Sequence, residues 1–189
     1  MSSAHLSSTR ASSVQGFPRI GRRRELKRAL ERYWHGDDTR AQLEAVGRRI
    51  RDSTWHALHD AGLTQLPGNT FSFYDHILDD ALLIGAVPAR FRELTAGLAP
   101  VDTVFALARG RADVSPLEMV QLQGTSYHYR QPEFSAGIEL GLRPDSLVDE
   151  IVRAQGFGYE LRPVVTGPVS LLLLSKSESG ADPGFTPLD

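Results

Sequence analysis

Apolar residues recur every three or four positions in the first third of the chain, a pattern that predicts two consecutive amphipathic helices. The apolar stripe of the first helix is formed by Leu26, Ala29, Leu30, Tyr33 and Trp34. Gly36 then supplies a left-handed C-cap. Thr39 and Gln42 have the spacing of a capping box, and Gly62 follows the last apolar position of the second helix. We therefore expect a helical hairpin over residues 23–61.

The rest of the chain alternates between short apolar runs and helical patterns. We predict strands near residues 17–20, 63–66, 126–129 and 161–165. We predict helices near residues 75–84, 101–109, 116–122 and 144–154, and one more after the break at residues 166–168. Strands that alternate with helices favour an α/β fold with a parallel sheet.

The composition is that of a single globular domain with terminal extensions. The Ser-rich residues 1–14 are expected to be a disordered lead-in, residues 15–176 the domain, and residues 177–189 a loop-like tail. No apolar run approaches the roughly 18 residues of a membrane span, so we expect a cytoplasmic protein that does not contact membranes. The 189 residues include no cysteine, which excludes disulfides, thiolate metal sites and cysteine nucleophiles.

Charge is distributed unevenly along the chain. Residues 1–60 hold 12 Arg and Lys against 7 Asp and Glu, whereas residues 61–189 hold 9 against 16. One cluster within ten residues contains Arg19, Arg22, Arg23, Arg24, Lys27 and Arg28. Cations disfavour a helix N-terminus, so the cluster indicates an anionic ligand; the alternative is a solvated basic turn paired with Glu25 and Glu31. Nucleic acid is disfavoured because no aromatic residues are interleaved with the cluster.

Two other groups of polar and aromatic residues are candidate pocket residues. Tyr74, Asp75 and His76 fall at a predicted loop-to-helix junction, where Asp75 could equally be a plain N-cap. His128 alternates with two tyrosines on a predicted strand, so it should face away from both. A third pair, His56 and His59, has a spacing that can bind a metal, but without a third ligand we interpret both as surface histidines.

Several long stretches, in the same order, resemble the N-terminal half of the cobalamin-independent methionine synthase family. They are GFPRIGRRRELKRALERYWHG, LPGNTFSFYDHILDDALLIGAVPARF, FALARGR, LEMVQ, YHYRQPEF and RPVVTGPVSLLLLSK. The resemblance covers about residues 15–188. It implies two (β/α)₈ barrels in the full enzyme, of which this chain would form an incomplete TIM-type barrel with an open, partial parallel sheet.

The resemblance also implies that the two barrels of the full enzyme have different roles. The family carries its zinc, its homocysteine site and most folate-ring contacts on the second barrel, so we expect no cofactor and no catalytic residue in this chain. Its RELK stretch helps to bind the polyglutamate tail of the folate, and here those residues are Arg24, Glu25, Leu26 and Lys27. A second tail-binding lysine of the family is replaced by Gln121, and the aromatic pair after it by Leu122 and Gln123.

The expected function is thus to recognise 5-methyltetrahydropteroyltri-L-glutamate for methyl transfer to homocysteine in methionine biosynthesis, without catalysis by the chain alone. Two alternatives remain open. The chain could be a module that complements a separately encoded C-terminal methionine synthase barrel, or a remnant without function. An incomplete barrel leaves a sheet edge open, so self-association is also expected.

Overall fold

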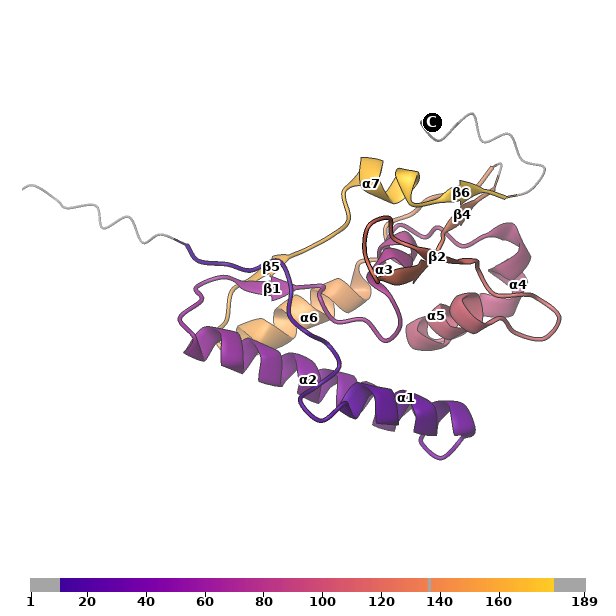
Figure 1. Cartoon of the computed structure of the whole chain (residues 1–189). Helices are drawn as coiled ribbons and strands as arrows, with labels where there is room; N and C mark the ends of the chain where they lie inside the picture. The colour runs from indigo at the N-terminus through magenta and orange to yellow at the C-terminus, as the bar shows by residue number, and fades with distance from the viewer. Residues whose placement is uncertain (1–10, 136, 179–189) are drawn as a thin grey trace, which may run out of the picture. The chain divides into compact units, whose positions relative to one another are not determined.

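The computed structural model describes residues 11–135 and 137–178, and these fall into two compact units (Figure 1). The first unit contains residues up to Thr70 together with Asp149–Val164, and the second contains Phe71–Val148 and the residues from Val165 onward. Each unit therefore takes its residues from two separate stretches of the chain. Of the predicted terminal extensions, residues 1–10 and 179–189 lie outside the described residues.

The first unit contains the predicted helical hairpin. Helices α1 (Glu25–His35) and α2 (Arg40–Asp60) pack against each other. The turn between them has the predicted chemistry: Gly36 adopts φ 85°, and the Thr39 side chain accepts a hydrogen bond from the backbone N–H of Gln42. A bidentate pair between Arg32 and Asp38, with N–O distances of 2.8 and 2.9 Å, also closes this turn.

A parallel strand pair completes the first unit. Strand β1 (Leu66–Gly68) pairs in parallel with β5 (Leu161–Pro163), and Leu66 lies opposite Leu161. The core beside this pair contains Trp55 and Leu58 from α2 and Ala154 from α6 (Asp145–Gly156). The strand predicted at residues 63–66 therefore begins three residues later than expected. Pro67 tolerates a strand position because a two-stranded sheet has only edge strands.

The strand predicted at residues 17–20 is wrong. This segment has no regular secondary structure, and Phe17 and Ile20 are 44% and 41% exposed. Pro18 has no N–H to donate to a sheet, and the carbonyl of Ile20 instead accepts a hydrogen bond from the N–H of Leu26. The segment thus forms the lead into α1.

Helices account for most of the regular secondary structure in the described part of the second unit. They are α3 (His76–Leu83), the short 3₁₀ helix η1 (Ala89–Phe91), α4 (Arg92–Thr95), α5 (Pro100–Arg109) and α7 (Pro168–Leu173). One core cluster of the unit combines Ile77 and Ala81 of α3, Tyr129, and Leu171 of α7. The predictions of α3, α5 and α7 are confirmed.

Four short strands of the second unit form two further pairs. Strand β2 (Met119–Gln121) pairs in antiparallel fashion with β3 (His128–Arg130), and β4 (Glu133–Phe134) pairs in parallel with β6 (Lys176–Ser177). The predicted helix at residues 116–122 is therefore wrong. Gly124, at φ 76°, permits the tight turn that brings residues 119–121 beside β3, and strand pairing overrides the helical pattern.

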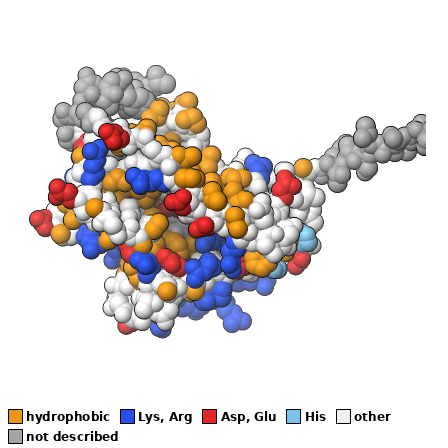
Figure 2. Space-filling view, turned by 180° about the vertical axis from the view of Figure 1, so that it is seen from behind, with side chains coloured by type: hydrophobic (Ala, Val, Ile, Leu, Met, Phe, Trp, Pro, Cys, Tyr) orange, Lys and Arg blue, Asp and Glu red, His pale blue; other side chains and the backbone are white. Residues whose placement is uncertain are grey.

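The α/β class is confirmed. The single open sheet expected from the sequence is not what the strands form, because the described strands make three separate two-stranded sheets. Apolar side chains reach the surface on the face shown in Figure 2. In the second unit the exposed ones include Val165, Val169 and Leu173, which follow a four-residue spacing along α7 and the loop before it. None of the helices in the described ranges combines the length and hydrophobicity needed to cross a membrane.

Candidate functional site

The arginine-rich segment forms a tight loop at the start of α1. Gly21 and Arg24 both have left-handed backbone conformations, with φ values of 82° and 60°. The N–H of Arg24 donates to the carbonyl of Gly21 over 3.1 Å. Arg24 occupies the N-cap position without capping the helix through its side chain. A non-glycine residue rarely adopts this conformation, so the chain holds Arg24 outward at a cost in backbone energy.

A carboxylate already occupies the backbone of this loop. Oε2 of Glu25 accepts a hydrogen bond of 2.9 Å from the backbone N–H of Arg23. Hydrogen bonds from the backbone N–H groups of Glu25 and Arg23 lower the pKa of the Glu25 carboxyl, with smaller contributions from the charges of Arg28 and Arg23. A Cβ atom at Gly21 would overlap this carboxylate. The Glu25 carboxylate therefore stabilises the conformation of this loop.

Exposed cations surround the loop. Arg22, Arg23, Arg24 and Arg28 are all exposed, and within the described part of the chain no acidic side chain lies within 4.0 Å of their charged groups. Lys27 pairs with Glu31 over 3.5 Å, but both side chains are 49% exposed, so the pair is weak and readily exchanged. The pairing of Lys27 with Glu31, and the charges of Arg23 and Arg28 that act on Glu25, are also the features expected of a solvated basic turn.

Leu26 has a different role from its three neighbours. Its side chain is fully buried and its N–H is bonded to Ile20, so it anchors α1 in the first unit. Of the four predicted tail-binding residues, Arg24 and Lys27 therefore present their charges to solvent, and Glu25 organises the loop. This arrangement follows from the helical stripe in which Leu26 is the first apolar position.

Gln121 belongs to the second unit, at the end of β2. It lies opposite His128 of β3, and its Nε2 donates to the carbonyl of Thr125 over 2.6 Å. Both Gln121 and His128 are exposed. The expected alternation along β3 holds, because Tyr129 is 4% exposed and the neighbouring His128 faces solvent.

Asp75 acts as a structural bridge within the second unit. Its Oδ1 accepts from the N–H of Leu78 over 2.8 Å, which caps α3, and its Oδ2 accepts from the N–H of Arg130 over 3.0 Å. The side chain is 2% exposed. Both oxygens thus have partners inside the fold, and the N-cap interpretation of Asp75 is confirmed.

The residues beside Asp75 contact β3 and the residue that precedes it. The hydroxyl of Tyr74 accepts from Arg130 over 3.2 Å, and the N–H of His76 donates to the hydroxyl of Tyr127 over 3.3 Å. Tyr74, Asp75 and His76 are therefore brought together around one end of β3, whereas His128 projects on the exposed side. Sequence reasoning missed Arg130, which joins Tyr74 to Asp75, because nothing local in the sequence links positions 55 residues apart.

The described residues offer no evident metal site. The sequence offers no cysteine, and no group of three or more His, Asp or Glu side chains within residues 11–135 and 137–178 could hold a metal ion. The zinc that the resemblance implies for the full-length family therefore does not fit the described residues.

Comparison with known proteins decides the family. The profile described as "Cobalamin-independent synthase, N-terminal domain" matches residues 11–187. The chain belongs to the cobalamin-independent methionine synthase family. Its match within that family is to the N-terminal domain, as the order of the sequence motifs predicts.

Several curated proteins are similar to this member of the methionine synthase family, and those described here are named 5-methyltetrahydropteroyltriglutamate–homocysteine methyltransferase. The protein from Mycobacterium tuberculosis (strain ATCC 25618 / H37Rv) is 47% identical over 169 residues, which are 89% of this chain and 22% of that protein. The protein from Rhodococcus jostii (strain RHA1) is 45% identical over 177 residues, 94% of this chain and 23% of that protein. The chain thus spans less than a quarter of the length of these relatives.

Proposed function

We propose that this chain serves as the opening part of the N-terminal barrel of a cobalamin-independent methionine synthase and binds the polyglutamate tail of the folate. The reaction of the whole enzyme would transfer a methyl group from 5-methyltetrahydropteroyltriglutamate to homocysteine. The name shared by the relatives supports this substrate, because it specifies a triglutamate. The two parallel strand pairs, β1 with β5 and β4 with β6, are compatible with part of a (β/α)₈ barrel.

The observation that carries the proposal is the position of the Glu25 carboxylate at the start of α1. The backbone N–H groups there already bind a glutamate carboxylate of the chain itself, and the exposed guanidinium groups of Arg22, Arg24 and Arg28 lie on the same segment. A triglutamate tail carries several carboxylates in succession. Guanidinium groups bind carboxylates through paired hydrogen bonds, so the arginines would bind those beyond the reach of the backbone.

The experiment is calorimetric titration of the full chain with monoglutamyl and triglutamyl 5-methyltetrahydrofolate. We expect the triglutamyl form to bind more tightly and its affinity to fall as salt is raised, because exposed charges are screened. Arg24→Ala should weaken triglutamyl binding by about 0.5–1 kcal/mol, the value of one exposed charge pair. Arg92→Ala removes an equally exposed arginine of α4 and is the matched control, which should leave binding unchanged.

Two results would overturn the proposal. Equal affinity for the two folates would show that the tail is not recognised. An equal effect of Arg24→Ala and Arg92→Ala would show that only the net charge of the chain matters, and not the loop at the start of α1.

A further inference from the structure

A short segment that precedes the arginine-rich loop is fastened to the rest of the first unit. This segment, residues 12–14, has no regular secondary structure, and it is called the N-terminal strap below (Figure 1). The chain is fastened a second time at Leu26, whose side chain is fully buried at the start of α1. Between these two points lie Arg19, Arg22 and Arg23 of the arginine-rich cluster.

Ser12 is bound through its backbone and its side chain. Its N–H donates to Oγ1 of Thr64 over 3.0 Å, and its carbonyl accepts from the N–H of Gln65 over 3.2 Å. Its hydroxyl donates to the carbonyl of Gly62 over 3.2 Å and accepts from the N–H of Thr64 over 3.3 Å. The N–H, the carbonyl and the hydroxyl of Ser12 thus all bind the segment between α2 and β1.

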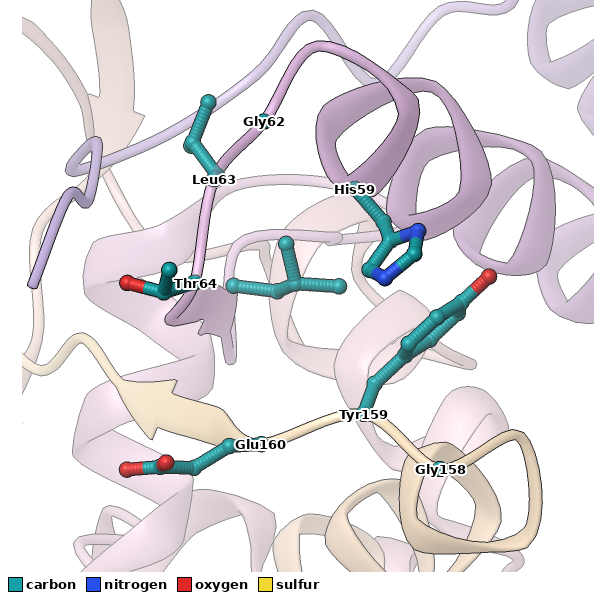
Figure 3. A pocket seen from close by; sticks show the side chains of 8 residues that line it. His59, Gly62, Leu63, Thr64, Gly158, Tyr159 and Glu160 are labelled. Atoms are coloured by element: carbon teal, nitrogen blue, oxygen red, sulfur yellow. The ribbon is translucent and has the colours of Figure 1, made fainter. Parts of the chain in front are cut away.

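The segment that receives Ser12 is shaped by the turn at the end of α2. Gly62 has a φ of 90° at this turn, a left-handed conformation that favours glycine. Figure 3 shows Gly62 and Thr64 along the turn, with the hydroxyl of Thr64 directed away from the rings of His59 and Tyr159. The Thr64 hydroxyl is therefore an acceptor for the strap and not part of the aromatic surface.

Arg162 of β5 binds the other end of the strap. Its Nε donates to Oγ of Ser13 over 3.0 Å, and one terminal nitrogen donates to the carbonyl of Val14 over 3.3 Å. Arg162 also lies opposite Pro67 in the parallel pair of β1 with β5. The strap is therefore tied to the residues before β1 and to a residue within β5, so its position follows that of the strand pair.

Fastening at both ends changes the cost of binding a ligand between the two points. A segment that is free at one end samples many more conformations than one that is closed into a loop. A ligand that binds the free segment has to offset the lost entropy from its own interaction energy. If the chain orders the segment when it folds, the ligand meets side chains that are already held in place.

From these contacts we infer that the N-terminal strap holds the arginine-bearing segment in place for an anionic ligand, with Ser12, Thr64 and Arg162 as positioning residues. They act through the segment that they fasten and not by contact with the ligand. The inference rests on the proposed recognition of the triglutamate tail, and it adds that this recognition depends on residues outside the arginine-rich loop.

The test compares two proline variants of the full chain by calorimetry with triglutamyl and monoglutamyl 5-methyltetrahydrofolate. Ser12→Pro removes both the N–H and the hydroxyl that fasten the strap. Ala11→Pro is the matched control, because Ala11 is exposed and forms no hydrogen bond with the described residues. Ser12→Pro should weaken triglutamyl binding by about threefold and monoglutamyl binding by less, because the ligand then orders the segment itself. Ala11→Pro should bind both folates as the wild type does.

A second pair of variants keeps the charge and the backbone unchanged. Thr64→Val removes the acceptor for the N–H of Ser12 and should weaken triglutamyl binding by about twofold. Thr64→Ser keeps the hydroxyl and should bind as the wild type does. Hydrogen exchange at the amides of Arg23 and Arg24, which are both hydrogen-bonded, measures the order of the segment directly. We expect faster exchange at both amides in Ser12→Pro and Thr64→Val, and no change in Ala11→Pro or Thr64→Ser.

The possible outcomes separate this inference from the proposed function. Equal affinity of the wild type for the two folates would overturn the proposed function, and the positioning role with it. A wild-type preference for triglutamate that Ser12→Pro keeps in full, or that Ala11→Pro reduces as much, would overturn the positioning role alone. So would unchanged exchange of the Arg23 and Arg24 amides in both Ser12→Pro and Thr64→Val.

Discussion

One carboxylate oxygen of Asp75 accepts a hydrogen bond of 3.0 Å from the backbone N–H of Arg130, and the other oxygen caps α3. The Asp75 side chain thus connects positions that lie 55 residues apart in the chain. A substitution there acts on a helix and a strand at once. This relationship explains why a residue at a loop-to-helix junction is only 2% exposed.

We predict that Asp75→Ala lowers the free energy of unfolding by about 2–4 kcal/mol, because α3 loses its cap and the N–H of Arg130 loses its acceptor. Asp75→Asn keeps one acceptor and should cost about 1 kcal/mol. Urea denaturation followed by circular dichroism measures both. Asp113→Ala, at an exposed turn, is the control; a loss as large as that of Asp75→Ala would contradict the assignment.

A second prediction concerns Gln121, the position at which the resemblance implies a lysine in the family. Gln121→Lys should strengthen binding of triglutamyl folate by about 1 kcal/mol, the value of one partly exposed charge pair. Calorimetry in low salt is the measurement. Because Gln121 also binds the carbonyl of Thr125, Gln121→Met is the control for loss of that hydrogen bond without gain of charge. Similar affinities for the lysine and methionine variants would show that a lysine at position 121 does not strengthen binding through its charge.

The third prediction concerns pH and the buried Glu150. Burial raises the pKa of its carboxyl above the ordinary 4.5, although Arg51 and the N–H of Asn69 oppose the shift. A carboxyl with a raised pKa in the folded state binds more protons than it does unfolded, so it destabilises the fold as pH rises from about 4.5 through the raised value. The wild type should therefore lose stability relative to Glu150→Gln over that interval.

Thermal melts of the two proteins at a series of pH values test this prediction. Other carboxylates, such as Asp38 and Glu118, contribute equally to both proteins, so they cancel in the difference between the two unfolding free energies. The pKa values of these two carboxyls are lowered by Arg32 and Lys176. A difference that stays constant with pH, or that grows in favour of the wild type, would show that Glu150 is not destabilised by its burial.

A fourth prediction concerns chemistry. The purified chain should form no methionine from methyl-folate and homocysteine, because the resemblance locates the zinc ligands and the homocysteine site of the family in the second barrel. Mass-spectrometric detection of methionine, with a relative that carries both barrels as the positive control, is the measurement. Turnover above the buffer blank in metal-free solutions would contradict it.

The fifth prediction concerns association. Val165, Val169 and Leu173 are 51%, 66% and 46% exposed, an apolar stripe that favours self-association. Light scattering should show oligomers, and Val169→Lys with Leu173→Lys should shift the chain toward monomer. If a separately encoded C-terminal barrel covers this stripe, the same two substitutions should also prevent that barrel from complementing the chain. Exposed Val152, on α6, gives the control Val152→Lys. A wild-type chain that is already a sharp-melting monomer would contradict the prediction.

The helical hairpin, its caps and the family can all be predicted from local features of the sequence. The stripe from Leu26 to Trp34, the cap at Gly36 and the capping box at Thr39 and Gln42 are local features, because helical hydrogen bonds join residues four apart. The arginine cluster was equally visible, because its residues are adjacent in the chain.

The strands and the roles of single polar residues depend on tertiary contacts. Met119–Gln121 became a strand because the turn at Gly124 brings it beside His128–Arg130, whereas residues 17–20 form no regular secondary structure. Arg130 reaches Tyr74 and Asp75 across more than fifty residues, and Leu161 meets Leu66 across ninety-five. Strand pairing and buried hydrogen bonds join residues that the chain keeps apart, so their partners are set by the fold as a whole and not by any local pattern.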